Sequence, residues 1–375
     1  MKRIEADVAI LGAGPAGAAA AIALGQAHRV VLLDRAAAPA DRIGETLPAA
    51  ARRLLGALGL WEDFLKDGHS PCHARRSVWG GGEPITLDAM CDPDGPGWRL
   101  DRRRFETRLR AAAAKGALLL APAGAGSVTR TDGGWRIDAD GPAPARIEAR
   151  LLIDASGRGA RPLRAQAGAP VSADRLICAW LHAPLRAEAA SVTYTESAED
   201  GWWYSAPLPD GRRLIAFHTD SDLARGGGAS LRLVERALAT PSLAETVADA
   251  DLAKASPMRL CAAHGGRLAS AAGPGWLAVG DAAMSFDPLS SQGLFHALYT
   301  GMKSGEATAL ILAGDDDAGP AFAAALEPVW DAYLFHRALY YGMERRWPDA
   351  PFWRRRLGAD AISARATRQG AAARG

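Results

Sequence analysis

The sequence carries a glycine-rich run whose spacing can bind the phosphates of a dinucleotide. The run follows the pattern G-x-G-x-x-G and consists of Gly12, Ala13, Gly14, Pro15, Ala16 and Gly17. The first glycine permits a tight turn, the second lets the backbone approach a pyrophosphate, and the third lets helix and strand pack closely. Asp34 follows 17 positions after Gly17, where a carboxylate can accept hydrogen bonds from ribose hydroxyls. A glycine-rich turn in an ordinary sheet is the alternative, but the acid favours a nucleotide site.

Two later carboxylates favour FAD as the dinucleotide. Asp154 closes the apolar run 149–153, and Asp281 follows Gly280 at the end of the run 276–279. An acid at the carboxyl end of a strand in an open α/β sheet points into the ligand crevice. FAD has a ribityl chain whose hydroxyls such a carboxylate can bind, whereas NAD has no such polyol. Either acid alone is compatible with a turn or a helix cap, but their order after the glycine run favours FAD.

A third segment predicts a stiff turn that leads into a helix. It reads Asp287-Pro288-Leu289-Ser290-Ser291-Gln292-Gly293-Leu294. Pro288 restricts the approach, Ser290 or Ser291 can cap, and a helix then begins at about Gln292. The oriented N–H groups at such a helix start stabilise negative charge. A plain capped helix is the alternative interpretation.

These segments require an α/β framework to bring them together. The runs 6–11 and 29–34 predict buried strands on either side of a helix at 15–25, which is a β–α–β unit with parallel pairing. Runs 176–185, 191–195 and 212–219 alternate weakly and predict an antiparallel sheet. The other expected elements are strands at 75–79, 83–88, 127–130, 134–138, 149–154 and 276–280, and helices at 49–58, 100–115, 291–312 and 321–347.

The expected fold class is therefore α/β, with a Rossmann-like FAD-binding domain of the glutathione-reductase type and an inserted antiparallel substrate domain. The FAD-binding domain is expected in the discontinuous pieces 1–70, 99–172 and 258–320. The substrate domain takes 71–98 and 173–257, and 321–375 forms a C-terminal helical segment whose end, from Ser363, is frayed.

Together these motifs resemble the large family of FAD-dependent aromatic hydroxylases and their halogenase relatives, from Ala6 to about Gly305. The resemblance implies that Asp154 lies beside the pyrophosphate, that Asp281 binds the ribityl chain, and that Arg102, after Asp101, approaches the cofactor. It also implies that the helix after Pro288 points at the flavin pyrimidine edge, where its N–H groups favour reduction and oxygen activation. The cofactor-binding residues expected in this way are Gly12, Gly14, Pro15, Ala16, Gly17, Asp34, Arg35, Glu45, Thr46, Arg102, Asp154, Gly157, Gly280, Asp281, Pro288, Gln292, Gly293 and Leu294.

Three local matches narrow the resemblance to one branch. Gly44-Glu45-Thr46-Leu47-Pro48 is similar to the G-E-[ST]-L-P segment of tryptophan halogenases and their relatives. Residues 97–102 and the doubled serine at 290–291 resemble flavoproteins that mature oxidases and dehydrogenases carrying a tryptophan-derived quinone. This resemblance implies hydroxylation of an indole-like ring, with a partner oxidase or dehydrogenase polypeptide that carries the target Trp.

Halogenation is disfavoured because no lysine is suitably placed. Halogenases need a lysine ammonium, some tens of residues after the G-E-[ST] segment, to relay oxidised halide. The corresponding stretch 72–79 has none, and the nearest, Lys66, sits in a polar turn. Arg75 or Arg76 is no substitute, because a guanidinium stays protonated and is a poor nucleophile.

An aromatic run at 201–207 is a candidate lining for an indole-sized cavity. It partly matches W-x-W-x-I-P of halogenases and Y-x-W-x-F-P of geranylgeranyl-reductase-like enzymes, but its Tyr204 and Ala206 depart from both. Trp202 and Trp203 either line the cavity or pack in a sheet core. The residues selected as catalytic are Glu45, Trp79, Trp203, Pro288 and Ser291.

The hypothesised reaction leaves the hard chemistry to the cofactor: reduced flavin and oxygen give a C4a-hydroperoxide, and an electron-rich ring takes its distal oxygen. NAD(P)H or a separate flavin reductase supplies the electrons, since only one dinucleotide fingerprint is present. Alternatives are a monooxygenase or halogenase of a small free aromatic substrate, a saturating isoprenoid reductase, and a flavin-bound assembly factor without turnover. Two alternative roles remain for four histidines, proton handling and a structural role: they are His69, His73, His218 and His296.

Composition and charge exclude other classes. The 375 residues are 49% hydrophobic, which is ordinary for a globular chain. With Lys+Arg at 44 against Asp+Glu at 42, nothing favours a nucleic-acid partner. The basic, aromatic helix at 331–353 either closes the domain, with aromatic residues inside and arginines outside, or docks a partner or membrane surface.

The cysteines and the N-terminal region predict the compartment. Cysteines are far apart with no C-x-x-C pair, which predicts buried or incidental thiols in a reducing compartment; they are Cys72, Cys91, Cys178 and Cys261. No secretion signal or transmembrane segment is recognisable, so the cytoplasm is expected. No cluster has metal-ligand spacing, so no metal is expected.

Overall fold

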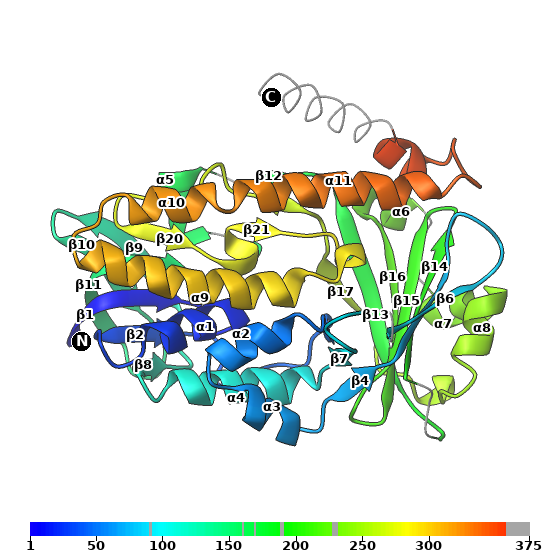
Figure 1. Cartoon of the computed structure of the whole chain (residues 1–375), viewed down its shortest axis with the longest axis horizontal. Coiled ribbons are helices and arrows are strands. Elements are labelled where there is room, and N and C mark those ends of the chain that lie inside the picture. Colours follow the sequence, from blue (N-terminus) through cyan, green and yellow to red (C-terminus); the bar gives the residue numbers. More distant parts are fainter. Residues whose placement is uncertain (90–91, 160, 169, 188–190, 227–231, 358–375) are drawn as a thin grey trace.

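The computed structural model describes the whole chain except residues 90–91, 160, 169, 188–190, 227–231 and 358–375. Two large β-sheets lie side by side, and the last two long helices run along the same edge of both sheets (Figure 1). These helices are α10 (Ala318–Ala324) and α11 (Glu327–Met343). The predicted α/β fold is confirmed. The tail from Ser363 lies outside the described residues.

The first sheet has eight strands and is parallel at its centre, in the order β19-β20-β11-β1-β2-β8. The hairpin β9–β10 pairs antiparallel with one half of β11, and β20 pairs parallel with the other half. Helices cover the parallel part of this sheet, so β2, β20 and the second halves of β1 and β11 are continuous apolar runs instead of alternating ones. The strands are β1 (Lys2–Leu11), β2 (Val30–Leu33), β8 (Ala117–Leu120), β9 (Ala125–Thr131), β10 (Gly134–Ala139), β11 (Ala145–Asp154), β19 (Ala272–Gly273) and β20 (Trp276–Ala278).

Small residues allow the helices on this sheet to pack closely. α1 (Pro15–Leu24) is rich in alanine and lies against α9 (Gly293–Leu312). A Cβ on Gly301 of α9 would lie 2.2 Å from the Ala16 carbonyl oxygen, and one on Gly305 would lie 2.6 Å from the Ala23 Cβ. Any larger residue at these two glycines would force the helices apart. α4 (Arg102–Ala113) also packs against α1.

The second sheet has seven strands in the order β17-β13-β16-β15-β14-β5-β6. Its pairings are antiparallel except for β14 with β5, which are parallel. The strands are β5 (Ala74–Val78), β6 (Ile85–Asp88), β13 (Leu176–Pro184), β14 (Val192–Ala198), β15 (Gly201–Pro207), β16 (Arg212–Asp220) and β17 (Arg259–Ala262).

The two faces of the second sheet are covered by different elements. α7 (Leu233–Leu238) and α8 (Pro241–Thr246) cover one face, where Trp203 and Phe217 are buried. The C-terminal region, including α11 and the helical residues 351–357, covers the other face, where Trp202 is buried. We call these the α7–α8 face and the α11 face.

The remaining elements are shorter. One small sheet consists of β3 (Thr46–Leu47), β4 (Ser70–Cys72) and β7 (Gly97–Arg99), and another of β12 (Val171–Ser172), β18 (Gly266–Arg267) and β21 (Met284–Ser285). The short helices are α2 (Ala51–Ala57), α3 (Trp61–Lys66), α5 (Arg164–Ala167) and α6 (Ser221–Gly226), and 3₁₀ turns lie at Arg161–Leu163, Leu252–Lys254, Gly280–Ala282 and Pro288–Ser290.

Three details differ from the sequence-based expectation. The helix expected at 321–347 is broken between α10 and α11, because Pro328 cannot continue a helix from the preceding turn. The aromatic run 201–207 is itself the strand β15, which was not assigned. β17 joins the edge of the second sheet, although residues from 258 onward were expected in the FAD-binding domain.

Candidate functional site

The ends of three parallel strands meet at one edge of the first sheet. Leu11 pairs with Asp154, and Asp154 pairs with Ala278, so the segments that follow them emerge together. The Val279 amide also donates to the Asp154 carbonyl at 2.9 Å. The glycine run and both predicted carboxylates are thereby brought to one place. This edge is where an open α/β sheet binds its ligand.

The glycine run is compact and open on one side. Gly12 has φ +111°, and a Cβ there would lie 2.4 Å from the Ala155 carbonyl oxygen. A Cβ on Gly17 would lie 1.9 Å from the Gly12 carbonyl oxygen, whereas one on Gly14 would meet no atom within 4 Å. No side chain caps α1, which begins at Pro15. The free N–H groups of the first turn therefore face open space, which suits a phosphate.

Asp34 fastens this run to the end of the second strand. Its carboxylate accepts from the Ala13 and Ala36 amides, both at 2.8 Å, and pairs with Arg110 at 3.0 Å. Each carboxylate oxygen has two acceptor directions, so a ribose hydroxyl can still be bound. Arg110 was not identified from the sequence, although it follows Arg102 by eight residues on α4. The predicted neighbour Arg35 is exposed.

Asp154 is completely buried and half unpaired. One carboxylate oxygen accepts from the Ser156 amide at 2.9 Å, and the other has no hydrogen-bond partner among the described residues. Burial raises the pKa of Asp154. Beyond it, Gly157 has φ +81° and open space where a side chain would be. A polar ligand at this position would supply the missing partner.

Asp281 lies at the same edge and is more accessible. Its carboxylate pairs with the Arg158 guanidinium at 3.2 Å, and its side chain is 33% exposed. Arg158 also donates to the Phe286 carbonyl at 3.1 Å. The preceding Gly280 donates its amide to the Thr300 hydroxyl at 2.8 Å. Hydrogen bonds from both sides thus fix the turn that presents the Asp281 carboxylate.

The loop at 287–292 leads into α9 without a side-chain cap. Pro288 begins a 3₁₀ turn, and Ser291 adopts the left-handed region at φ 52°. Neither serine caps α9, which corrects the sequence prediction: the Ser290 hydroxyl donates to the Asp287 carbonyl and accepts from the Gln292 amide. The helix begins at Gly293, where a Cβ would meet no atom within 4 Å. The first-turn N–H groups of a 20-residue helix are therefore available to a negatively charged ligand.

A carboxylate and two hydroxyls meet where the two sheets adjoin. The buried Glu45 accepts a short hydrogen bond from the Tyr204 hydroxyl of β15, and Thr46 is 3.0 Å from the same hydroxyl. The Gly44 amide donates to the other Glu45 oxygen at 3.1 Å. Burial, together with the Glu45 charge, raises the pKa of Tyr204 far above its usual value, so this hydroxyl remains a donor.

Arg102 holds the segment that carries Glu45. Its guanidinium donates to the carbonyl groups of Ile43 and Gly44 and pairs with Glu106 at 2.5 Å. The Arg102 Nε atom has no hydrogen-bond partner within the described part of the chain. The side chain is only 9% exposed. Arg102 therefore both positions this segment and retains one free buried donor.

Residues 5–318 match a family model described as FAD binding domain. The chain belongs to this family of flavoproteins. It is a FAD-dependent oxidoreductase of the aromatic hydroxylase and halogenase superfamily, as its motifs predicted.

Three known proteins are similar to the flavoprotein along most of its length. LodB of Marinomonas mediterranea, a FAD-dependent oxidoreductase, is 31% identical over 370 residues, which are 95% of this chain and 98% of LodB. The myxobacterial chondrochloren halogenase CndH has the same fold, with a TM-score of 0.85 at 22% identity over 99% of this chain and 90% of its own. QhpG is a peptidyl tryptophan dihydroxylase essential for tryptophylquinone cofactor biogenesis. It gives a TM-score of 0.74 at 25% identity over 95% of this chain and 79% of its own.

The site fits FAD on several independent observations. At three glycines, open space lies where a side chain would be: Gly14, Gly157 and Gly293. Two helix starts, at α1 and α9, lack side-chain caps. Buried Asp154 and Arg102 retain unpartnered polar atoms. Phosphates, ribityl hydroxyls and a flavin ring edge would satisfy these groups.

The structure separates the three tryptophans considered for the site. Trp203 is buried on the α7–α8 face, which fits the alternative that it packs in the sheet core. Successive strand residues alternate between faces, and Trp202 and Tyr204 take the α11 face instead. Trp79 donates to the Tyr340 carbonyl at 2.8 Å and packs against the rings of Trp202, Tyr341 and Trp353, which are 5.5–6.4 Å away.

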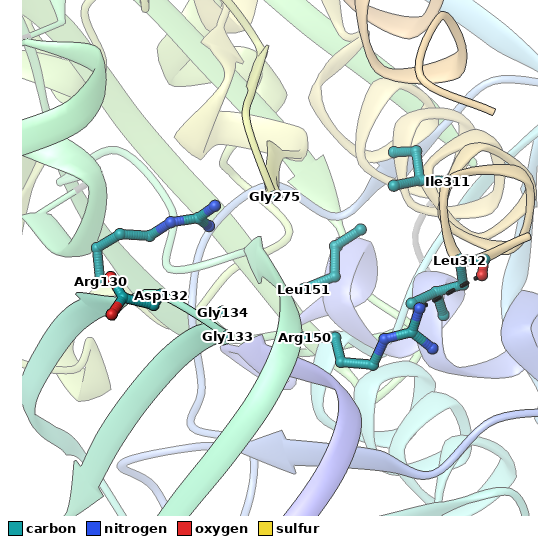
Figure 2. Close-up of a pocket in the computed structure, with 9 residues that line it drawn as sticks. All are labelled: Arg130, Asp132, Gly133, Gly134, Arg150, Leu151, Gly275, Ile311 and Leu312. Carbon is teal, nitrogen blue, oxygen red and sulfur yellow. Dashed lines mark hydrogen bonds between the residues drawn. The ribbon is translucent and has the colours of Figure 1, made fainter. Parts of the chain in front are cut away.

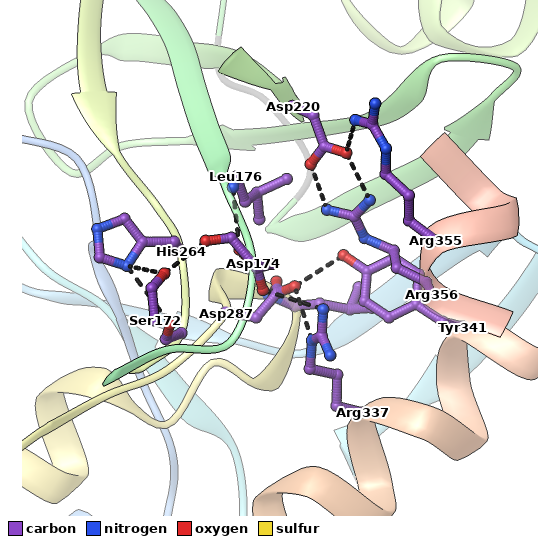
Figure 3. A network of polar contacts seen from close by, with 12 residues as sticks. Ser172, Asp174, Leu176, Asp220, His264, Asp287, Arg337, Tyr341, Arg355 and Arg356 are labelled. Carbon is purple, nitrogen blue, oxygen red and sulfur yellow. Dashed lines mark hydrogen bonds and ion pairs between the residues drawn. The ribbon is translucent and has the colours of Figure 1, made fainter. Parts of the chain in front are cut away.

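α11 contacts the loop at 287–292 through a buried polar network (Figure 3). The Tyr341 hydroxyl donates to the Asp287 carboxylate at 2.7 Å and accepts from the Trp202 indole at 3.1 Å. Arg337 pairs with Asp174 at 2.9 Å. Arg356 pairs with Asp220 at 2.8 Å, with both side chains buried. The aromatic residues of this region divide: Tyr333, Tyr341 and Phe352 are buried, whereas Phe335 and Tyr340 are exposed. Arg337 and Arg356 are buried as well, so aromatics inside and arginines outside describes the segment only in part.

Three of the four candidate histidines are not equipped for acid–base work near neutral pH. Burial lowers the pKa of His69 and His296 to about 4 and that of His218 to about 3. His218 stacks on Trp202 with ring centroids 3.6 Å apart. His73 is exposed at the surface. The buried three are therefore neutral, which suits structural roles.

A surface pocket of about 230 Å³ lies apart from these residues, where β9 ends and β10 begins, beside β11 and the start of β20 (Figure 2). It is lined by Arg130, Asp132, Gly133, Gly134, Arg150, Leu151, Gly275, Ile311 and Leu312. None of the predicted site residues lines it.

Within the described residues, no group of three or more His, Cys, Asp or Glu side chains could hold a metal ion. In the same residues, no helix is both long enough and apolar enough to cross a bilayer.

Proposed function

We propose that this flavoprotein is a FAD-dependent monooxygenase that hydroxylates an indole-like ring, and that the ring is a Trp side chain of a partner oxidase or dehydrogenase polypeptide. The hydroxylation accompanies maturation of a quinone cofactor in that partner. The observation that carries the proposal is the Glu45–Tyr204–Thr46 cluster, which lies between the FAD-binding edge and the second sheet.

In this proposal, different residues hold different parts of FAD. The run Gly12–Gly17 and the start of α1 hold the pyrophosphate, Asp34 holds the ribose, and Asp281 holds the ribityl chain. The loop from Pro288 to Leu294 presents the α9 amides to the flavin ring. When bound, FAD supplies the activation of molecular oxygen.

The protein's own residues supply proton handling and orientation. Glu45 is placed to accept a proton from a reacting ring, because this buried carboxylate is already oriented by a hydrogen bond from the Tyr204 hydroxyl, which itself lies 3.0 Å from the Thr46 hydroxyl. Hydroxylation of an aromatic ring removes one ring proton, and a buried carboxylate is suited to receive it. The Gly44 amide and the Tyr204 hydroxyl each donate to one oxygen of this carboxylate, and Thr46 contacts the Tyr204 hydroxyl in turn, so the carboxylate is held in one orientation.

The placement of lysines supports hydroxylation over halogenation. The chain has five lysines, and none lies beside Glu45 or the 287–294 loop. Lys66, the nearest in sequence to the position that halogenases use, is 71% exposed and pairs with Asp63 at 3.7 Å. The others are Lys2, Lys115, Lys254 and Lys303, the last of which pairs with Glu306 at 2.7 Å.

A partner polypeptide is supported by similarity to QhpG, which acts on a peptidyl tryptophan. The test is co-expression with the oxidase or dehydrogenase polypeptide encoded nearest to this gene, followed by peptide mass spectrometry of its Trp residues. We expect added oxygen on one Trp, which disappears with the Glu45→Gln variant. Unmodified Trp in a stable complex would contradict the proposal and support an assembly factor without turnover.

Free substrates form the second arm of the test. Free L-tryptophan with bromide, oxygen and reduced flavin should give no brominated product; bromotryptophan would overturn the assignment. Hydroxylation of free tryptophan at a rate equal to that of the peptide would show that the substrate is small.

The electron source is tested separately. Anaerobic addition of NADPH or NADH to the FAD-loaded protein bleaches the flavin if the chain uses a nicotinamide directly. A flavin that bleaches only after addition of a flavin reductase assigns the electrons to that second enzyme.

A further inference from the structure

Two cysteines that are far apart in the sequence lie directly opposite each other in the second sheet. Cys178 on β13 and Cys261 on β17 are paired residues of an antiparallel ladder. Directly opposed residues in such a ladder have Cα atoms about 4.5–5.5 Å apart, which lies within the range that a disulfide spans. Both side chains lie on the α11 face. A small approach of the two sulfurs would allow a covalent bond.

The two thiols already interact and are not equivalent. Cys178 is 1% exposed, whereas Cys261 is half-buried and reachable by solvent. The Cys178 thiol donates to the Ala179 carbonyl at 3.8 Å, and burial raises the pKa of Cys178. The neighbouring Cys178 thiol lowers the pKa of Cys261 although burial opposes this, and the Arg158 charge and the Trp180 indole act in the same direction as Cys178. An accessible thiol with a lowered pKa beside a buried thiol is the arrangement of a reacting cysteine and its resolving partner.

The pair adjoins groups that already belong to the flavin site. The Glu45 charge acts on Cys178, and Arg158, which acts on Cys261, also pairs with Asp281. Hydrogen peroxide forms wherever reduced flavin reacts with oxygen without passing the oxygen to a substrate. A peroxide-reactive thiol here would therefore meet its oxidant at the place of formation.

We propose that Cys178 and Cys261 form a redox-active dithiol, which hydrogen peroxide oxidises to a disulfide and a small thiol reduces again. The Cys261 thiolate attacks one peroxide oxygen, the O–O bond breaks, and Cys261 becomes a sulfenic acid while water leaves after protonation. The Cys178 thiol then attacks the Cys261 sulfur, an S–S bond forms, and a second water leaves. The two thiols together lose two electrons and two protons, and one peroxide becomes two waters.

The experiment uses the FAD-loaded full-length protein, hydrogen peroxide, and alkylation of remaining thiols before trypsin digestion. Trypsin places each cysteine on a different peptide, with Cys178 on Leu176–Arg186 and Cys261 on Leu260–Arg267. We expect these two peptides to become linked, with the loss of two hydrogens, and to separate after dithiothreitol. Cys72 is the internal control, because its sulfur contacts Thr193 and Arg99 instead of another cysteine.

Two variants separate the roles of the thiols. With Cys178→Ser, the Cys261 sulfenic acid should persist and react with dimedone. With Cys261→Ser, Cys178 should stay reduced, with its oxidation slowed about tenfold or more, as expected for a buried protonated thiol. Equal oxidation of Cys178 in the wild type and in Cys261→Ser would overturn the proposal, as would oxidation of wild-type Cys261 to a sulfinic acid without any linked peptide. These readouts do not depend on substrate turnover, so they stand apart from the test of the hydroxylase function.

Discussion

Two buried tyrosine–glutamate pairs lie on opposite faces of the second sheet. On the α11 face, Tyr204 donates to Glu45, and on the α7–α8 face, Tyr194 donates to Glu196 at 2.6 Å. Tyr194 and Glu196 are two residues apart on one strand and lie in an apolar cluster under α8. Tyr204 and Glu45 come from segments 159 residues apart, at the junction of the two sheets. We therefore expect the local, enclosed pair to be structural, and the pair assembled from distant segments to serve the proposed reaction.

The largest expected effect separates the two glutamates by activity. Glu45→Gln should lower kcat by about 10²–10⁴-fold, because it removes a positioned proton acceptor. Glu196→Gln is the matched control and should leave kcat nearly unchanged. Turnover and the flavin absorption spectrum are measured for both, and an equal loss in the two variants would abolish the distinction between the faces.

Tryptophan substitutions should separate stability from cofactor environment. Trp203→Phe should cost about 2 kcal/mol of unfolding free energy, since it leaves a void in the core of the α7–α8 face, with the flavin spectrum unchanged. Trp202→Phe removes the donor to Tyr341, which contacts the Asp287 loop. We expect Trp202→Phe to shift the flavin spectrum as well; a shift with Trp203→Phe alone would reverse the assignment of the faces.

Glu344 gives the α11 face a definite pH dependence. Burial opposes its ionisation, but hydrogen bonds from Arg346, Ser197 and the Gly80 amide lower its pKa to about 2. Since the folded pKa lies below the unfolded value, the stabilisation is present above pH 4.5 and is lost as the pH falls towards 2. Glu344→Gln should cost about 1–3 kcal/mol at pH 7, and less at pH 3, by urea unfolding. A constant cost at both values would contradict this.

Glu196 should show the opposite and smallest dependence. Burial raises its pKa, so its folded value lies above the unfolded one. Its contribution is therefore complete below pH 4.5 and declines as the pH rises through the folded value. Relative to wild type, Glu196→Gln should gain stability between pH 4 and pH 7 in the same urea series. A gain towards acid pH would show that the carboxylate is stabilised in its charged form.

The sequence predicted local features well because they depend on neighbouring residues. The glycine run, the parallel strands and the helix after Gln292 follow from short patterns, and the structure has them all. The break before α11 is the exception: a single helix was expected over 321–347, although Pro328 marks the break locally. These features need no knowledge of which segments meet in space.

Features that depend on long-range register were missed. β15 is buried on both faces, so it lacks the alternation that marks a strand, and nothing local tells which face Trp203 takes. The ion pair between Arg110 and Asp34 forms only because of the way α4 packs in the fold. Cys178 and Cys261, 83 residues apart, lie together because β17 returns to the edge of the second sheet, which no spacing motif indicates.

The scattered origin of the cofactor edge has a consequence for biosynthesis. Asp34, Asp154 and Asp281 converge from widely separated stretches, and α9, which faces the glycine run, follows all three. During synthesis, the N-terminal strands stay partly unpaired until the C-terminal segments have left the ribosome. Loading of the cofactor is therefore a late event in synthesis, and a supply of free FAD or low temperature during expression should raise the yield of intact protein.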